Sequence, residues 1–208
     1  MRKLIFIFSI IIIPLIILLA NFRFYIFNEK YYENEFEKHG INKLFEKNDL
    51  KNRLDNILNF LKDKEEINKR YFNEREVLHL YDVKNLIKNS ILILYVLVGL
   101  LVIFLPVLRD KKIILNAFVY GLSLTIVMLL FLFLITTTNF SITFLNFHYA
   151  AFSNDYWQLN AEEDKLILMF PEVFFYDISI RILFNSLILS IVLLILLFIK
   201  KSNWGSVN

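Results

Sequence analysis

Cysteine is absent from this chain of 208 residues, and glycine, proline and histidine are scarce. Without cysteine there is no disulfide, no thiolate metal site and no cysteine nucleophile. Four glycines in the whole chain argue against a glycine-rich phosphate-binding loop. The sequence also has no basic patch of the kind that binds nucleic acid. We therefore expect neither a nucleic-acid partner nor a cofactor.

Apolar residues make up 57% of the sequence, whereas about 45–50% is usual for a soluble domain. They gather in runs close to the ~20 residues that cross a bilayer as a helix. The sequence thus predicts an all-α integral membrane protein, a single membrane domain over residues 1–208, with four transmembrane helices at about residues 4–27, 90–108, 113–135 and 182–199. Arg2 and Lys3 before the first run also fit a signal peptide. Leu18 occupies a cleavage position that prefers a small residue, so we favour an uncleaved anchor.

Charge is distributed unevenly between the two sides of the predicted spans. The segments on one side, residues 28–89 and 136–181, are neutral and acidic, respectively. The other side is rich in basic residues, which the positive-inside rule assigns to the cytoplasm: Arg2, Lys3, Arg109, Lys111, Lys112, Lys200 and Lys201. We therefore expect a multi-pass protein of the plasma membrane with both termini cytoplasmic. Its two extracellular segments would form a membrane-apposed cap.

The two outer segments carry different local patterns. An apolar stripe at helical spacing predicts an amphipathic helix that lies either on the outer leaflet or against the spans: Leu50, Leu54, Ile57, Leu58 and Leu61. A second helical stretch runs from about Asn73 towards the second span. Alternating apolar residues over 140–144 predict an extended chain. Asn160 and Glu163 predict the start of a short helix that Pro171 ends.

All three histidines lie in the outer segments, where imidazole is the usual proton carrier near neutral pH. His79 precedes the second span and His148 follows the third, so a tight hairpin between these spans would bring them together. Asp82 follows His79 by one helical turn, where its carboxylate would fix the ring tautomer. That spacing favours His79 as the base, but which of the two histidines is the base stays open. A structural role for each histidine, or a metal site completed by Asp82 or Asp155, are the alternatives. A serine hydrolase finds less support, because neither Ser141 nor Ser153 sits in a nucleophile elbow.

Ionisable residues are nearly absent from within the spans, which argues against a proton-coupled transporter or ion channel. Arg23 and Arg181 are the exceptions, each near the outer end of a span. Either side chain would snorkel to the lipid headgroups. Alternatively, one of them would bind a lipid phosphate or stabilise an oxyanion.

Two stretches carry a resemblance to a known family: Glu76-Val-Leu-His79-Leu-Tyr-Asp82-Val83-Lys84, and His148 to Trp157 followed by Phe170-Pro171-Glu172. Together with the four-span layout, the chain resembles the bacterial lipoprotein intramolecular transacylases. The resemblance implies transfer of the sn-2 acyl chain of a diacylglyceryl-cysteine lipoprotein to the cysteine α-amino group, at the outer leaflet and without a cofactor. Membrane lipids would be the other partner.

The resemblance also assigns residues to that activity. It places the two functional histidines at His79 and His148, and makes Asn154, Asp155 and Trp157 supporting or interfacial residues. His39 has no counterpart in the family that we can place, and we expect it to be incidental. A lipid-ester hydrolase, and a non-catalytic protein whose external segments bind a lipid or protein partner, are the alternatives.

Overall fold

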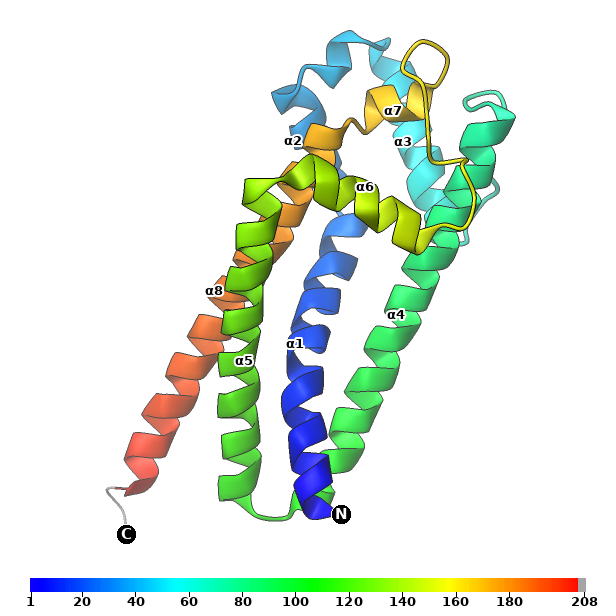
Figure 1. The fold of residues 1–208 in the computed structure, drawn as a ribbon. Coiled ribbons are helices and arrows are strands. Elements are labelled where there is room, and N and C mark those ends of the chain that lie inside the picture. Colours follow the sequence, from blue (N-terminus) through cyan, green and yellow to red (C-terminus); the bar gives the residue numbers. More distant parts are fainter. Residues whose placement is uncertain (206–208) are drawn as a thin grey trace. The chain divides into compact units, whose positions relative to one another are not determined.

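The computed structural model describes residues 1–205, and the regular elements within them are all helical (Figure 1). In chain order they are α1 (Arg2–Ile26), α2 (Glu29–Lys38), η1 (Ile41–Lys43), α3 (Lys47–Leu61), α4 (Glu74–Leu108), α5 (Lys111–Thr138), α6 (Phe140–Ala151), α7 (Lys165–Met169) and α8 (Glu172–Gly205). The chain divides into two compact units. Unit 1 comprises Met1–Arg23, Ile91–Thr138 and the chain from Ser179 onward, and unit 2 comprises Phe24–Ser90 and Asn139–Ile178.

Unit 1 is built from the four long apolar helices α1, α4, α5 and α8, each long enough to cross a bilayer. Figure 1 shows these helical segments side by side within the unit. Ile13 and Ile17 of α1 pack on Leu122 of α5, and residues of α4, α5 and α8 close around them: Leu101, Phe118, Leu194 and Leu197. Gly121 permits this approach, because a Cβ built there would lie 2.6 Å from Cδ1 of Ile13.

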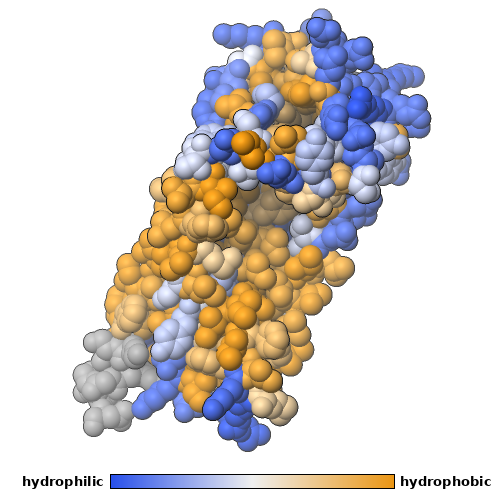
Figure 2. All heavy atoms as spheres, viewed as in Figure 1, coloured by the Kyte–Doolittle hydropathy of each residue, from blue (hydrophilic) through white to orange (hydrophobic). Residues whose placement is uncertain are grey.

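The surface of unit 1 is too apolar to face water. Val102, Ile103, Val127 and Phe131 are each more than 60% exposed. Figure 2 shows apolar side chains covering the flank of this unit. A contiguous exposed surface of this kind marks contact with lipid. The prediction of an all-helical membrane protein with four spans is therefore confirmed.

The start of α1 and the turn between α4 and α5 lie at the same end of unit 1 (Figure 1). Arg109 takes a left-handed conformation in that turn, with φ at 57°, and the Asp110 carboxylate accepts a hydrogen bond from the Lys112 amide at 2.7 Å. The basic residues that flank these two segments thus share one end. The assignment of that end to the cytoplasm stays a prediction.

Unit 2 has its own core, in which aromatic rings of α2 pack against the segment that starts α8. Phe174 contacts the rings of Tyr32, Phe36 and Phe170 with centroids 5.2–6.2 Å apart. On α3, the predicted amphipathic stripe is buried inside the protein: Leu50, Leu54, Ile57, Leu58 and Leu61. Of the two roles considered for that stripe, the structure supports packing within the protein.

The N-terminus of α4 is fixed by a reciprocal capping pair. The Asn73 side chain accepts a hydrogen bond from the Glu76 amide at 3.0 Å, and the Glu76 carboxylate accepts one from the Asn73 amide at 2.7 Å. The second Glu76 oxygen accepts a hydrogen bond from the Leu166 amide, near the start of α7, at 2.6 Å. One buried carboxylate therefore holds two helix N-termini of unit 2.

Two sequence-based expectations about the second outer segment are wrong. Residues 140–144, predicted to be extended, begin helix α6, because Asn139 caps it and Phe144 stacks on Phe140 with centroids 5.5 Å apart. The helix expected to start near Asn160 begins only at Lys165. The Asn160 amide instead donates to the Asp164 carboxylate at 2.6 Å, which closes a turn before α7. The break at Pro171 is confirmed.

Candidate active site

His79 lies in the first turns of α4, in the part of that helix that belongs to unit 2 and precedes the apolar spanning segment. Its side chain is buried, and Nδ1 has no hydrogen-bond partner among the described residues. Burial, aided by the charge of His148, lowers the pKa of His79 to about 4, against a smaller opposing effect of Asp82. His79 is therefore a neutral imidazole at pH 7.

His148 lies in α6, one helical turn after Phe144. Its Nδ1 is 2.7 Å from the backbone carbonyl oxygen of Phe144. A carbonyl oxygen only accepts hydrogen bonds, so Nδ1 of a neutral His148 carries the hydrogen and donates it. The other ring nitrogen, Nε2, is then left with its lone pair. The backbone of α6 thus selects the tautomer that can take up a proton at Nε2.

The two imidazoles come together as predicted. Their ring centroids are 6.4 Å apart, with the planes inclined by 33°. Phe152 contacts both rings, at 5.3 Å from His79 and 5.7 Å from His148. Trp157 lies 4.9 Å from His148 and Phe144 lies 4.3 Å from it. These aromatic contacts restrict rotation of His148 and give the histidine pair an apolar lining.

Asp82 does not play the part that its spacing predicts. Within residues 1–205 its carboxylate accepts a hydrogen bond from the Asn154 side-chain amide at 2.9 Å, and Nδ1 of His79 stays without a partner. Asp82 therefore acts on His79 through charge, and the expectation that it fixes the His79 tautomer is wrong. Asp82 and Asn154 also line an open polar hollow with residues of α4 and of the end of α6: Asn85, Leu86, Asn89, Ala151, Phe152 and Ser153.

The other residues expected near the site fall into two groups. Trp157 contacts His148 directly, as described above. Asp155 is exposed, and it accepts hydrogen bonds from Arg75 at its backbone oxygen, at 2.8 Å, and from Gln158 at its carboxylate, at 3.0 Å. Asp155 thus shapes the loop that carries Asn154 and Trp157.

Arg23 and Arg181 are both exposed and belong to unit 1. A role for them in binding lipid or an oxyanion stays a prediction. Among the described residues, the side chains spaced to share a metal ion are Glu35, His39 and Asp177, so the metal alternative for the histidine pair finds no support there.

Two contributors were missed by sequence reasoning. The Phe144 carbonyl fixes the His148 tautomer, and its signal was the i, i+4 spacing of Phe140, Phe144 and His148, which the apolar alternation obscured. Arg75 was missed because a contact with a backbone oxygen of a distant loop leaves no mark in the sequence.

Comparisons with known proteins give a consistent result. The model of the family described as lipoprotein intramolecular transacylase Lit matches residues 7–175. The solved structure of the membrane-integral Lit from Bacillus cereus is 26% identical, with a TM-score of 0.82 over 97% of this chain and 98% of that one. A variant of that protein with a histidine replaced by alanine is 27% identical, with a TM-score of 0.81 over 97% and 96% of the two chains. No curated protein sequence matches the chain.

Proposed function

The chain belongs to the family of lipoprotein intramolecular transacylases, and from this premise we propose that it moves the sn-2 acyl chain of a diacylglyceryl-cysteine lipoprotein to the cysteine α-amino group, with His79 and His148 as its catalytic residues. The product is the N-acyl, lyso-form lipoprotein. The reaction takes place at the outer leaflet, and its partners are the lipoprotein substrate and membrane lipids.

The hydrogen bond from Nδ1 of His148 to the Phe144 carbonyl is the observation that carries this proposal. It supplies a base of the correct tautomer, with Nε2 free to accept a proton. The α-amino group of the substrate has an ordinary pKa near ~7.7–8.0, so imidazole is a suitable acceptor for its proton near neutral pH. His148 is accordingly the base, which reverses the assignment that the spacing of Asp82 favours.

The reaction exchanges an ester for an amide within one substrate molecule. The neutral amine attacks the sn-2 ester carbonyl carbon, a C–N bond forms, and one amine proton passes to Nε2 of His148. The tetrahedral intermediate then collapses, the C–O bond to glycerol breaks, and the sn-2 oxygen takes up the proton held by His148. Holding amine and ester together supplies up to roughly 7–11 kcal/mol in favourable intramolecular systems.

His79 serves as a hydrogen-bond donor in this scheme. A neutral imidazole keeps one N–H, and the lowered pKa of His79 means that the ring stays neutral at pH 7. Its N–H stabilises the negative charge that develops on the carbonyl oxygen. A donor fixed by burial does this without reorganisation, because Phe152 and the surrounding helix hold the ring in place.

The aromatic lining favours aminolysis over hydrolysis. Phe144, Phe152 and Trp157 pack their rings against His148, and apolar groups of this kind disfavour water beside the imidazole. Water at that nitrogen would be activated just as the amine is, and would release a free fatty acid. The lining therefore supports transfer within the substrate.

Fragmentation mass spectrometry of a lipoprotein N-terminal peptide tests the proposal. The peptide comes from cells that otherwise make only the diacylglyceryl form, with and without this protein. Intact mass does not suffice, because moving an acyl chain within one molecule leaves the mass unchanged. We expect fragments with an acyl group on the amine. A free-amine diacyl product in every strain would indicate the non-catalytic alternative, and loss of one acyl chain would indicate a hydrolase.

Substitution with glutamine separates the two roles. Glutamine can donate a hydrogen bond but cannot take up a proton. We expect His148→Gln and His148→Ala to lose about 10²–10⁴-fold in rate, the usual contribution of general base catalysis. His79→Gln should retain more activity than His79→Ala. Asn146→Ala, at an exposed position of the same helix α6, is the matched control and should leave the rate unchanged. If His148→Gln kept more activity than His148→Ala while His79→Gln was as inactive as His79→Ala, then His79 would be the base and His148 the hydrogen-bond donor.

A further inference from the structure

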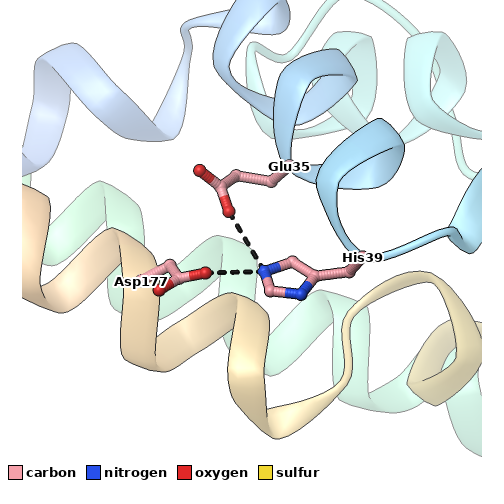
Figure 3. A group of neighbouring side chains, drawn as sticks. All are labelled: Glu35, His39 and Asp177. Atoms are coloured by element: carbon pink, nitrogen blue, oxygen red, sulfur yellow. Dashed lines mark hydrogen bonds and ion pairs between the residues drawn. The ribbon is translucent and has the colours of Figure 1, made fainter.

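A second cluster of ionisable side chains lies in unit 2 and shares no residue with the histidine pair. Glu35 lies in α2, His39 caps the end of that helix one turn later, and Asp177 lies in the first turns of α8. Figure 3 shows the two carboxylates pointing at the same nitrogen of His39. Nε2 of His39 is 2.6 Å from Oδ2 of Asp177 and 3.3 Å from Oε2 of Glu35.

The spacing of these atoms suits a small divalent cation. All three residues offer one ligand atom, and these atoms lie within 4.8 Å of one another. Tetrahedral zinc with bonds of about 2.0–2.2 Å keeps its ligand atoms roughly 3.3 Å apart. The separation between Glu35 and His39 already has this value, and the contact between His39 and Asp177 would open by well under 1 Å. One imidazole and two carboxylates also form a donor set that zinc accepts.

A cation already occupies part of this cluster. Nζ of Lys38 lies 2.5 Å from Oδ2 of Asp177 and 3.3 Å from Oε2 of Glu35, so both carboxylates face one positive charge. The Glu35 side chain is only 7% exposed, and a carboxylate buried to that degree needs a positive partner. The Lys38 side chain, by contrast, is 53% exposed, so its ammonium can turn into solvent when another cation takes its place beside the carboxylates. The cluster is thus a cation-binding site in which the Lys38 ammonium can be displaced.

We propose that Glu35, His39 and Asp177 bind a zinc ion that displaces the Lys38 ammonium and joins the end of α2 to the start of α8. The fourth position of the tetrahedron is open to water. His39 and Asp177 are each 18% exposed at the side chain, which gives the ion a path from solvent. The role of His39 is then to ligate a metal that fastens two segments of unit 2, independently of acyl transfer.

Zinc titration of the full-length, tag-free protein in detergent, after treatment with a chelator, tests the proposal. Calorimetry should show one zinc per chain. His39→Ala should weaken binding by more than about tenfold, because even the outer partners of a metal ligand are typically worth 10–100-fold in affinity. Asp177→Asn should weaken binding in the same way, and Glu37→Gln is its matched control, since it removes one carboxylate charge from an exposed position of α2 and should leave binding unchanged.

The Lys38→Gln variant tests whether the cluster is a metal site or only a network of ion pairs. With the competing ammonium removed, zinc should bind more tightly than to the unaltered protein. At about a hundredfold excess over Kd, zinc should raise Tm of the unaltered protein and of Lys38→Gln by roughly 5 °C or more. The rise should be clearly smaller for His39→Ala, because its weaker binding leaves less excess of zinc over its Kd.

Three results would overturn the zinc site. They are the absence of one-to-one binding, unaltered binding to both His39→Ala and Asp177→Asn, and weaker binding to Lys38→Gln. The Lys38→Gln test does not depend on whether the ligand variants fold. Acyl transfer is measured separately with the histidine variants described above, so failure of one proposal leaves the other standing.

Discussion

Removing the Glu76 carboxylate gives the most direct test of how unit 2 is held together. Glu76 is 1% exposed, and its two oxygens accept hydrogen bonds from two backbone amides that are distant in sequence. One is the Asn73 amide, which precedes α4, at 2.7 Å, and the other is the buried Leu166 amide of α7, at 2.6 Å. Glu76→Ala leaves both N–H groups without their acceptor.

The size of the loss follows from these two bonds. The Leu166 amide is a buried donor, and leaving it unsatisfied costs about 1–3 kcal/mol. Asn73 is exposed, so its amide can turn to water and the lost cap costs about 1 kcal/mol, which makes roughly 2–4 kcal/mol in total. For a chain of this length, about 2–4 °C of Tm is lost per kcal/mol. We therefore expect Glu76→Ala to lower Tm by roughly 4–16 °C. The Tm of Glu76→Gln should lie between those of the unaltered protein and Glu76→Ala. Its single carbonyl oxygen replaces one acceptor, while its NH2 group faces the other donor.

Thermal unfolding in detergent, followed by tryptophan fluorescence, measures this effect. Glu74→Ala is the control, since it removes the same charge at an exposed position two residues earlier in α4. If Glu76→Ala melts at the same temperature as Glu74→Ala, the carboxylate does not join the two helix N-termini. A Glu76→Gln variant less stable than Glu76→Ala would equally contradict the reasoning.

Three further predictions concern the site and unit 1. The pKa of His79 is about 4 in the folded protein and about 6.5 ordinarily, so the unfolded chain binds the proton more readily between these values. The contribution of neutral His79 to stability is therefore complete above pH 6.5 and declines as the pH falls towards 4. Tm measured from pH 7 to 4.5 should fall less steeply in His79→Gln than in the unaltered protein. Gly121→Ala should lower Tm, and Ile13→Ala should offset this in the double variant, because the added Cβ would meet Ile13 at 2.6 Å. Trp157→Phe should retain most of the transfer activity and Trp157→Ala should lose it, as only the former keeps a ring against His148.

The spans were readable from the sequence because the signal is large. A run such as residues 91–108 is apolar over a full bilayer thickness, and neither caps nor tertiary contacts are needed to recognise it. The stripe from Leu50 to Leu61 was readable for the same reason, since it repeats at helical spacing. The sequence did not show what this stripe packs on, because burial against protein and contact with lipid require the same apolar residues.

Helix α6 shows where pattern reasoning fails. Phe140, Ile142 and Phe144 alternate as a strand would, yet the same residues supply the i, i+4 pair of rings that stack along a helix. The Asn139 cap and the contact of Phe144 with Phe175 decide between the two, and the second of these joins residues distant in sequence. Short apolar segments are therefore assigned by their partners and not by their period alone.

The pairing of the two histidines was predictable from topology, but their roles were not. Asp82 stands one turn from His79, and spacing alone made it the orienting carboxylate. In the folded chain Asn154 donates a hydrogen bond to that carboxylate, and the group that orients the His148 imidazole is the backbone carbonyl of Phe144. A backbone atom is present at every position, so no residue type in the sequence marks the one that matters.

His148, the proposed base, and His79, the proposed oxyanion donor, are held in place by different parts of the structure. The tautomer of His148 depends on an i, i+4 hydrogen bond within its own helix, so it persists as long as α6 is helical around Phe144. The position of His79 depends instead on burial and on the Glu76 carboxylate that anchors the start of α4. Loosening unit 2 should therefore impair oxyanion stabilisation before it impairs the base. In a destabilised variant such as Glu76→Ala, measured below its Tm, the residual rate should resemble that of His79→Ala, and adding His148→Ala should lower it further. A Glu76→Ala variant already as inactive as His148→Ala would show that the two histidines do not depend on separate supports.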